Sequence, residues 1–87
     1  MSKQLTTIIV DDEPLARKGL AVRLQEHQDI EIIAQCTNGR AALEAVRAYQ
    51  PDLIFLDIQM PGLNGFEVVE AIIEQGLHLP MVVFVTA

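Results

Sequence analysis

The sequence predicts an α/β protein built on a doubly wound parallel sheet. Four short apolar runs, each too short for a helix, alternate with three stretches of helical periodicity over 87 residues. This order favours parallel strands joined by right-handed crossovers, with helices on both faces of the sheet. Three of the runs end at a polar side chain, namely Asp11, Asp57 and Thr86. One small domain accounts for the whole length.

The first strand is expected over residues 5–10, which are mostly β-branched or apolar and are followed by Asp11. Pro14 fits the first turn of a helix, which we expect over residues 14–27. Apolar residues recur along this helix at helical spacing: Leu15, Ala16, Leu20 and Leu24. Its basic residues are predicted to form a solvent-exposed face: Arg17, Lys18 and Arg23.

A second strand is expected over residues 30–35, where mixed polarity favours a position at the edge of the sheet. Residues 37–39, Thr-Asn-Gly, then indicate a turn and the start of a second helix. This helix ends before Pro51, because the residue before a proline disfavours the helical conformation. Its predicted inward residues are Ala42, Leu43, Val46 and Tyr49.

The third strand covers residues 53–56 and leads directly to Asp57. After a loop rich in proline and glycine, Asn64 and Glu67 form the pattern of a capping box at the start of a third helix. Gly76 is placed to end this helix. Its predicted apolar stripe consists of Phe66, Val69, Ile72 and Ile73. Residues 81–85 are continuously apolar and predict a fourth strand.

Composition excludes several classes of function. A net charge of −6 argues against direct binding to nucleic acid, which requires clustered Lys and Arg. No apolar run approaches the ~20 residues of a membrane span, and the first residues lack the features of a secretory signal, so we expect a cytoplasmic protein without membrane contact. His27 and His78 lie apart from each other near helix ends, and we expect both at the surface.

Carboxylates follow two strands of the predicted sheet. Because parallel strands end at one edge, Asp11, Asp12 and Asp57 should converge there together with Thr86. Oxygen ligands without nearby His or Cys suit a hard ion, and Mg²⁺ is the natural candidate. A carboxylate beside Mg²⁺ can attack a phosphoryl group and hold it as an acyl phosphate, with the hydroxyl of Thr86 contacting a phosphoryl oxygen. The alternative is that each aspartate only caps a turn.

Four motifs together resemble the receiver domain of bacterial two-component response regulators. They are Val10-Asp11-Asp12-Glu13-Pro14, Leu56-Asp57-Ile58-Gln59-Met60-Pro61-Gly62, the helix start Asn64-Gly65, and Val85-Thr86-Ala87. The resemblance covers the whole chain and implies the flavodoxin-like (CheY-like) fold of that family. The residues 11–17, Asp-Asp-Glu-Pro-Leu-Ala-Arg, and 83–87, Val-Phe-Val-Thr-Ala, further resemble receivers that precede a LytTR-type DNA-binding domain.

This resemblance implies specific roles. Asp57 would be phosphorylated by a sensor histidine kinase, in a self-catalysed transfer rather than as an enzyme acting on a separate substrate. Asp12 and Asp57 would hold Mg²⁺ by their side chains, Asp11 would act mainly through water, and Gln59 would contribute its backbone carbonyl. Thr86 would be the switch hydroxyl. DNA would be bound only through an output domain outside residues 1–87, giving a role in transcription regulation.

The sequence departs from the family in one respect. Receivers continue through a fourth helix, a fifth strand and a fifth helix, which carry a phosphate-binding lysine and a switch aromatic. Residues 1–87 therefore predict an incomplete receiver, in which Lys3 and Lys18 lie in elements that do not match that lysine. The apolar strand 81–85 would be left as an open edge, which predicts self-association, with a two-fold dimer as the expected form.

Two other functions compete with phosphoryl acceptance. The first is a receiver remnant that only mediates association between proteins. The second is an aspartyl-phosphate phosphatase of the haloacid dehalogenase type. That class has a second aspartate two residues after its nucleophile, whereas Gln59 occupies this position and cannot act as a general acid.

Overall fold

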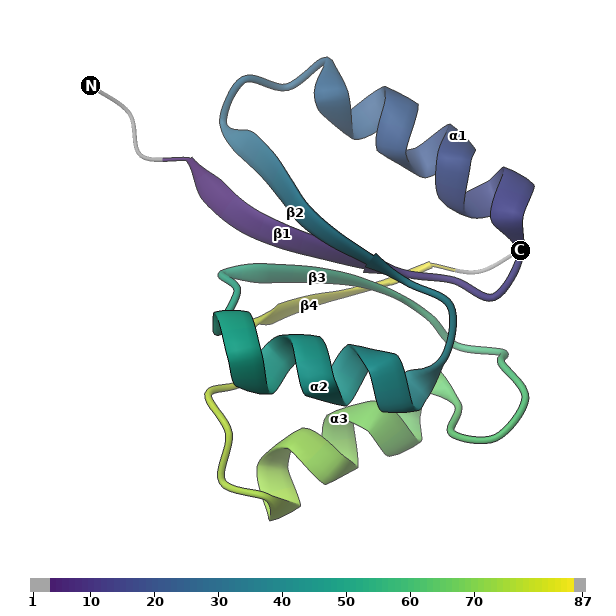
Figure 1. The fold of residues 1–87 in the computed structure, drawn as a ribbon, viewed down its shortest axis with the longest axis vertical. Helices are drawn as coiled ribbons and strands as arrows, with labels where there is room; N and C mark the ends of the chain where they lie inside the picture. Colours follow the sequence, from purple (N-terminus) through teal and green to yellow (C-terminus); the bar gives the residue numbers. More distant parts are fainter. Residues whose placement is uncertain (1–3, 86–87) are drawn as a thin grey trace.

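The computed structural model describes residues 4–85, which form strands and helices in strict alternation (Figure 1). The strands are β1 (Leu5–Val10), β2 (Ile30–Cys36), β3 (Leu53–Asp57) and β4 (Met81–Val85). The helices are α1 (Pro14–Gln25), α2 (Gly39–Tyr49) and α3 (Gly65–Glu74). Within this part of the chain no helix is long and apolar enough to cross a bilayer.

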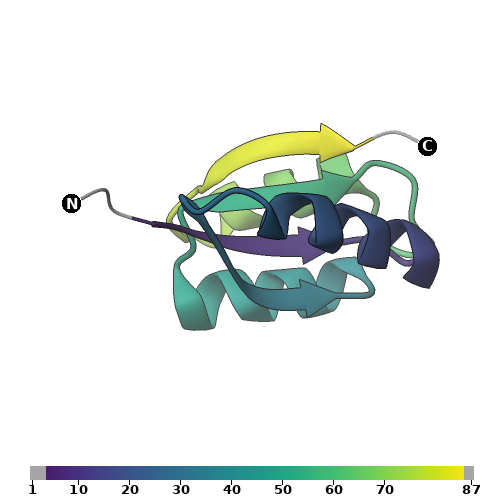
Figure 2. The same cartoon turned by 90° about the horizontal axis from the view of Figure 1, so that it is seen from above.

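The four strands form one sheet in the order β2-β1-β3-β4, and every neighbouring pair is parallel. Figure 2 shows the strand arrowheads pointing the same way, with β2 and β4 at the two edges. The doubly wound parallel sheet and the edge position of the second strand are therefore confirmed. The strand order reverses between β1 and β3, and this is the point where open α/β sheets place their ligand site.

The helices cover both faces of the sheet, with α1 on one face and α2 and α3 on the other (Figures 1 and 2). Alternate residues of β1 point to opposite faces, so Ile9 packs with Leu24 of α1 while Ile8 packs with Val46 of α2. The core under α2 and α3 is the larger of the two. This packing holds β1 and β3 at the centre of the sheet.

The N-terminal ends of β1 and β3 are joined by hydrogen bonds between Thr6 and Asp52. The backbone N–H and the hydroxyl of Thr6 donate to Oδ2 of Asp52 at 2.9 and 3.1 Å. The N–H of Asp52 in turn lies 2.8 Å from the Thr6 carbonyl and 3.0 Å from its hydroxyl oxygen. These contacts align the two central strands at the end opposite the acidic cluster.

Both predicted ends of α3 are confirmed. Asn64 and Glu67 form a reciprocal capping box at the start of the helix. Gly76 follows its end with a φ of +68°, a conformation that favours glycine.

The predicted apolar stripe of α3 is half right, because Ile72 is buried and Val69 packs against the core, while the other two residues are exposed. The core-facing residues are Val68 and Ile72, whereas Phe66 and Ile73 are 53% and 60% exposed. At 100° per residue, Phe66 and Ile73 lie about 100° or more around the helix from the Val68–Ile72 face. Apolar residues occupy both sides of α3, so periodicity alone did not identify the buried one. The ring of Phe66 instead packs against Phe84 of β4, with 5.0 Å between ring centroids.

Three further predictions about the helices need correction. Tyr49, the last residue of α2, is exposed rather than inward. Leu15 is exposed at the first turn of α1, whose buried residues are Ala21 and Leu24. This helix ends at Gln25, two residues before the expected His27, where the backbone turns toward β2.

Candidate metal and phosphoryl-acceptor site

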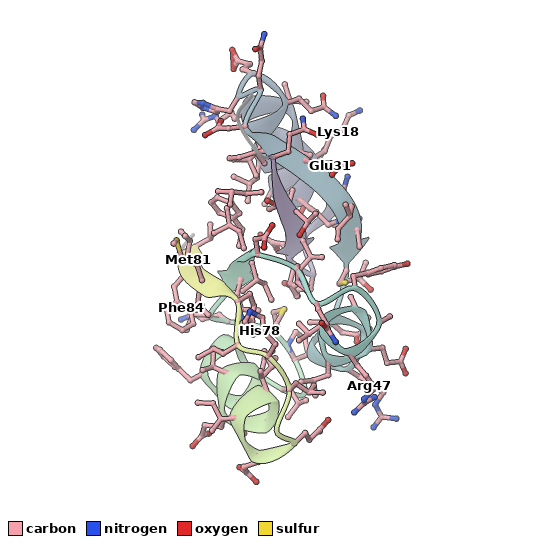
Figure 3. All side chains as sticks on the ribbon, turned by 90° about the vertical axis from the view of Figure 1, so that its left-hand side faces the viewer. Lys18, Glu31, Arg47, His78, Met81 and Phe84 are labelled. Atoms are coloured by element: carbon pink, nitrogen blue, oxygen red, sulfur yellow. The ribbon has the colours of Figure 1, made fainter. Side chains whose placement is uncertain are left out.

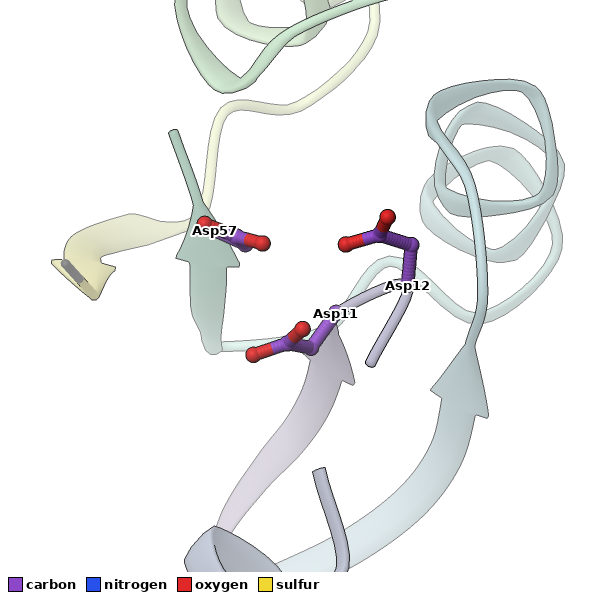
Figure 4. A group of neighbouring side chains, drawn as sticks. All are labelled: Asp11, Asp12 and Asp57. Carbon is purple, nitrogen blue, oxygen red and sulfur yellow. The ribbon is translucent and has the colours of Figure 1, made fainter. Parts of the chain in front are cut away.

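Three carboxylates meet where β1 and β3 end. Val10 of β1 pairs with Leu56 of β3, so the residues that follow them, Asp11 and Asp57, lie side by side. Asp12 joins them from the β1–α1 loop, and Figure 4 shows the three side chains directed toward one another. One carboxylate oxygen from each of the three lies within 4.8 Å of the other two. The predicted convergence of these acids is confirmed.

Asp11 is the buried member of the cluster, with 7% of its surface exposed. Its N–H donates to the carbonyl of Cys36 in β2 at 3.1 Å. Its Oδ1 accepts from the N–H of Glu13 at 2.9 Å, and its carbonyl accepts from Nη1 of Arg17 at 2.8 Å. Asp11 is thus fixed through three of its polar atoms.

Asp57 is half-buried, and its Oδ1 accepts a hydrogen bond from the N–H of Gln59 at 3.1 Å. Burial raises the pKa of Asp57 above its usual 3.8, and the negative charges of Asp11 and Asp12 raise that pKa further, while the hydrogen bond from Gln59 opposes the shift. In the absence of a cation, the site therefore disfavours the ionised form of Asp57.

The cluster lines a hollow of about 240 Å³. Its lining residues are Asp11, Asp12, Glu13, Ala16, Asp57, Gln59 and Val85. A larger hollow of about 460 Å³ beside the loop after β3 has no ionisable lining residue. Oxygen ligands with an exposed member, Asp12, fit Mg²⁺, which binds a few carboxylates and keeps several waters.

Gly65, at the start of α3, allows that helix to pack against the backbone that leaves Asp57. Its N–H donates to the carbonyl of Ile58 at 2.9 Å. A Cβ on Gly65 would lie only 2.6 Å from the carbonyl oxygen of Asp57. Only glycine fits this approach without moving the backbone beside the acidic site.

The three aspartates and Gln59, which the sequence indicated, line this hollow, but sequence reasoning missed two residues that shape the loop after β1. Oε1 of Glu13 accepts from the N–H of Leu15 at 3.0 Å and caps α1. The position of this acid directly before Pro14 is the sequence signal that could have identified the cap. Arg17 was predicted on a solvent-exposed face, but it is half-buried and contacts Asp11. Thr86, the predicted switch hydroxyl, lies outside the described residues.

A parallel β2-β1-β3-β4 sheet with an acidic cluster at its strand ends defines the class of protein. Residues 7–87 match the response regulator receiver domain family, and the chain belongs to that family. The receiver domain of the putative response regulator NarL from Mycobacterium tuberculosis superimposes with a TM-score of 0.90 at 30% identity, over 98% of this chain and 68% of that one. The response regulatory domain of mrkE from Klebsiella pneumoniae gives a TM-score of 0.83 at 36% identity, over 95% and 67%.

Curated relatives agree with this assignment. The transcriptional regulatory protein BtsR of Escherichia coli strain K12 is 48% identical over 95% of this chain and 34% of its own length. An uncharacterized response regulatory protein of Vibrio cholerae is 43% identical over 100% of this chain and 33% of its own length. The chain thus spans about a third of the length of the curated relatives that it matches.

Proposed function

We propose that this receiver domain accepts a phosphoryl group on Asp57 from a sensor histidine kinase, with Mg²⁺ as the cofactor. The observation that carries the proposal is the convergence of three carboxylates within 4.8 Å at the strand ends. Asp57 is the acceptor because it ends a central strand, faces the two acids that follow β1 and is half-buried. One of its oxygens forms a bond to phosphorus as the bond from phosphorus to the donor nitrogen breaks.

Asp11, Asp12, Asp57 and the backbone carbonyl of Gln59 would hold Mg²⁺, with Asp11 acting mainly through water. The bound ion supplies positive charge that offsets the carboxylates and the transferred phosphoryl oxygens. Before transfer, the N–H of Gln59 orients the Asp57 carboxylate through its hydrogen bond to Oδ1. The hydroxyl of Thr86 would then contact the phosphoryl group and report its presence.

The role of the whole protein is also a proposal. BtsR is named as a transcriptional regulatory protein. We infer that phosphorylation of this domain controls an output domain that binds DNA, and that the protein works in the cytoplasm beside its kinase. Residues 1–87, with a net charge of −6, would not contact DNA themselves.

A second candidate function, association between protein chains, is favoured by the surface of β4. This strand carries no charged residue, and in the described part of the chain it pairs only with β3. Met81 and Phe84, labelled in Figure 3, are 67% and 39% exposed. Pairing of two β4 edges about a two-fold axis would cover such a strand. The phosphatase alternative has no comparable support, because Gln59 is a neutral amide.

The decisive experiment is incubation with Mg²⁺ and a small acyl phosphate, followed by intact-mass analysis. The wild-type chain should gain one phosphoryl group, and Asp57→Asn should gain none. Asp29→Asn is the matched control, because Asp29 is an exposed aspartate away from the site and accepts the hydrogen bond from Leu5 through its backbone carbonyl. Phosphorylation of Asp57→Asn at the wild-type rate would show that the acceptor is misassigned.

A further inference from the structure

One basic residue of α1 differs from its neighbours. Lys18 and Arg23 are exposed, as expected for a solvated face, whereas Arg17 is half-buried. Its Nη1 donates to the backbone carbonyl of Asp11 at 2.8 Å, six residues earlier in the chain. Helix side chains lean toward the N-terminus of their helix, which brings this guanidinium back over the β1–α1 loop.

Stabilisation of the helix does not explain this position. Arg17 is the fourth residue of α1, and a cation near the positive end of a helix dipole is unfavourable. A residue that destabilises its own helix at this position indicates a compensating tertiary contact. The contact to Asp11 is that compensation, since a charged donor makes a stronger hydrogen bond than a neutral one.

The bonded carbonyl belongs to the peptide that joins Asp11 to Asp12. Rotation about the backbone bonds on either side of this peptide would move one carboxylate relative to the other, because the two side chains flank it. The N–H of Asp11 is held by Cys36 and its Oδ1 by the N–H of Glu13, so the Arg17 contact holds the remaining polar atom of the Asp11 backbone. Because Arg17 binds a backbone carbonyl, it does not itself occupy a carboxylate oxygen that a cation could bind.

We propose that Arg17 is a positioning residue for the Mg²⁺ site, which orients the Asp11–Asp12 peptide and thereby sets the spacing of its two carboxylates. The inference rests on the proposed function of the acidic cluster as a Mg²⁺ site. Arg17 touches no reacting atom and acts only through this peptide. Loss of groups that orient metal ligands typically weakens metal binding about 10- to 100-fold.

The change in charge alone would alter Mg²⁺ affinity in the opposite direction. Removing a positive charge beside three carboxylates strengthens their attraction for a cation. Lys18 lies on the same helix, next to Arg17 in sequence and exposed. Arg17→Gln and Lys18→Gln therefore remove the same charge, but only the first removes the hydrogen bond to Asp11.

The test measures Mg²⁺ affinity of the full chain by isothermal titration calorimetry, well below the unfolding temperature of each variant. Arg17→Gln should weaken Mg²⁺ binding about ten-fold or more. Lys18→Gln should leave it unchanged or slightly tighter, and Arg17→Lys, which retains a charged donor, should recover part of the loss. Unchanged or tighter binding in Arg17→Gln overturns the proposal, as does an equal loss in Lys18→Gln.

Two further variants distinguish a folding defect from a failure of the metal site itself. If Arg17→Gln does not fold, Arg17→Met, which keeps an apolar side chain of similar length, replaces it in the test. If neither variant folds, Arg17 is required for folding and the proposal is refuted. Asp12→Asn tests the site. If wild type and Asp12→Asn bind Mg²⁺ alike, the proposed function fails, whereas a loss in Asp12→Asn without one in Arg17→Gln refutes only the role of Arg17.

Discussion

Replacement of Gly65 by alanine should disturb the acidic site through the backbone of Asp57, without altering any polar group. The new Cβ would lie 2.6 Å from the carbonyl oxygen of Asp57 and 3.0 Å from the Cα of Ile58. The first distance is 0.8 Å short of the 3.4 Å at which ordinary contact begins, and both neighbours are backbone atoms that cannot rotate away. Either α3 or the backbone after β3 must move.

The expected cost follows from this overlap. Overpacking of a well-packed region costs about 1–3 kcal/mol, and for a domain of this size each kcal/mol lowers Tm by about 4–8 °C. A shift of the Asp57 backbone by a substantial part of 1 Å should also slow phosphorylation, since a 1 Å misplacement can cost about 100-fold in rate. Gly65→Ala should thus lower both Tm and the rate of phosphorylation.

Thermal unfolding by circular dichroism and the intact-mass assay check the two effects. Gly19→Ala is the matched control, because Gly19 lies within α1 and a Cβ there meets no atom within 4 Å. That substitution should stabilise the chain by up to about 1 kcal/mol through helix propensity. If Gly65→Ala melts at or above the wild-type temperature and is phosphorylated at the wild-type rate, the close approach does not constrain the site.

Three further predictions concern charge, association and strand alignment. Folding raises the pKa of Asp57, mainly through burial and then through its acidic neighbours. The neutral form of Asp57 therefore stabilises the fold below pH 3.8, and this stabilisation is lost as the pH rises through the folded-state pKa. Asp57→Asn should therefore melt higher than wild type at neutral pH without Mg²⁺, with a gain that shrinks toward pH 3.8; an equal gain at every pH contradicts this. The 87-residue chain should form a dimer at tens of micromolar in light scattering after size exclusion, and Val83→Lys in β4 should make it monomeric; a folded wild-type monomer refutes the idea. Asp52→Ala should cost about 1–3 kcal/mol in urea unfolding, because it leaves the N–H and hydroxyl of Thr6 without this partner.

Features that depend on local chemistry could be predicted from the sequence. Asp57 was assigned to a strand end because a four-residue apolar run can only be a short strand between proline-containing turns. The capping box of Asn64 and Glu67 and the helix stop at Gly76 follow from side-chain hydrogen bonding and backbone freedom within a few residues. Parallel topology, itself inferred from the order of the elements, then placed Asp11, Asp12 and Asp57 at one edge of the sheet.

Tertiary packing, by contrast, selects which face of an element is buried and which residue reaches across a loop. Val68 rather than Phe66 faces the core, although α3 is apolar on two sides. Arg17 binds Asp11 while Lys18 faces solvent, although both are basic residues on one helix. The tight space at Gly65 exists only because α3 approaches the backbone of β3. These features depend on how separate elements pack against each other in three dimensions, which periodicity and local propensity do not specify.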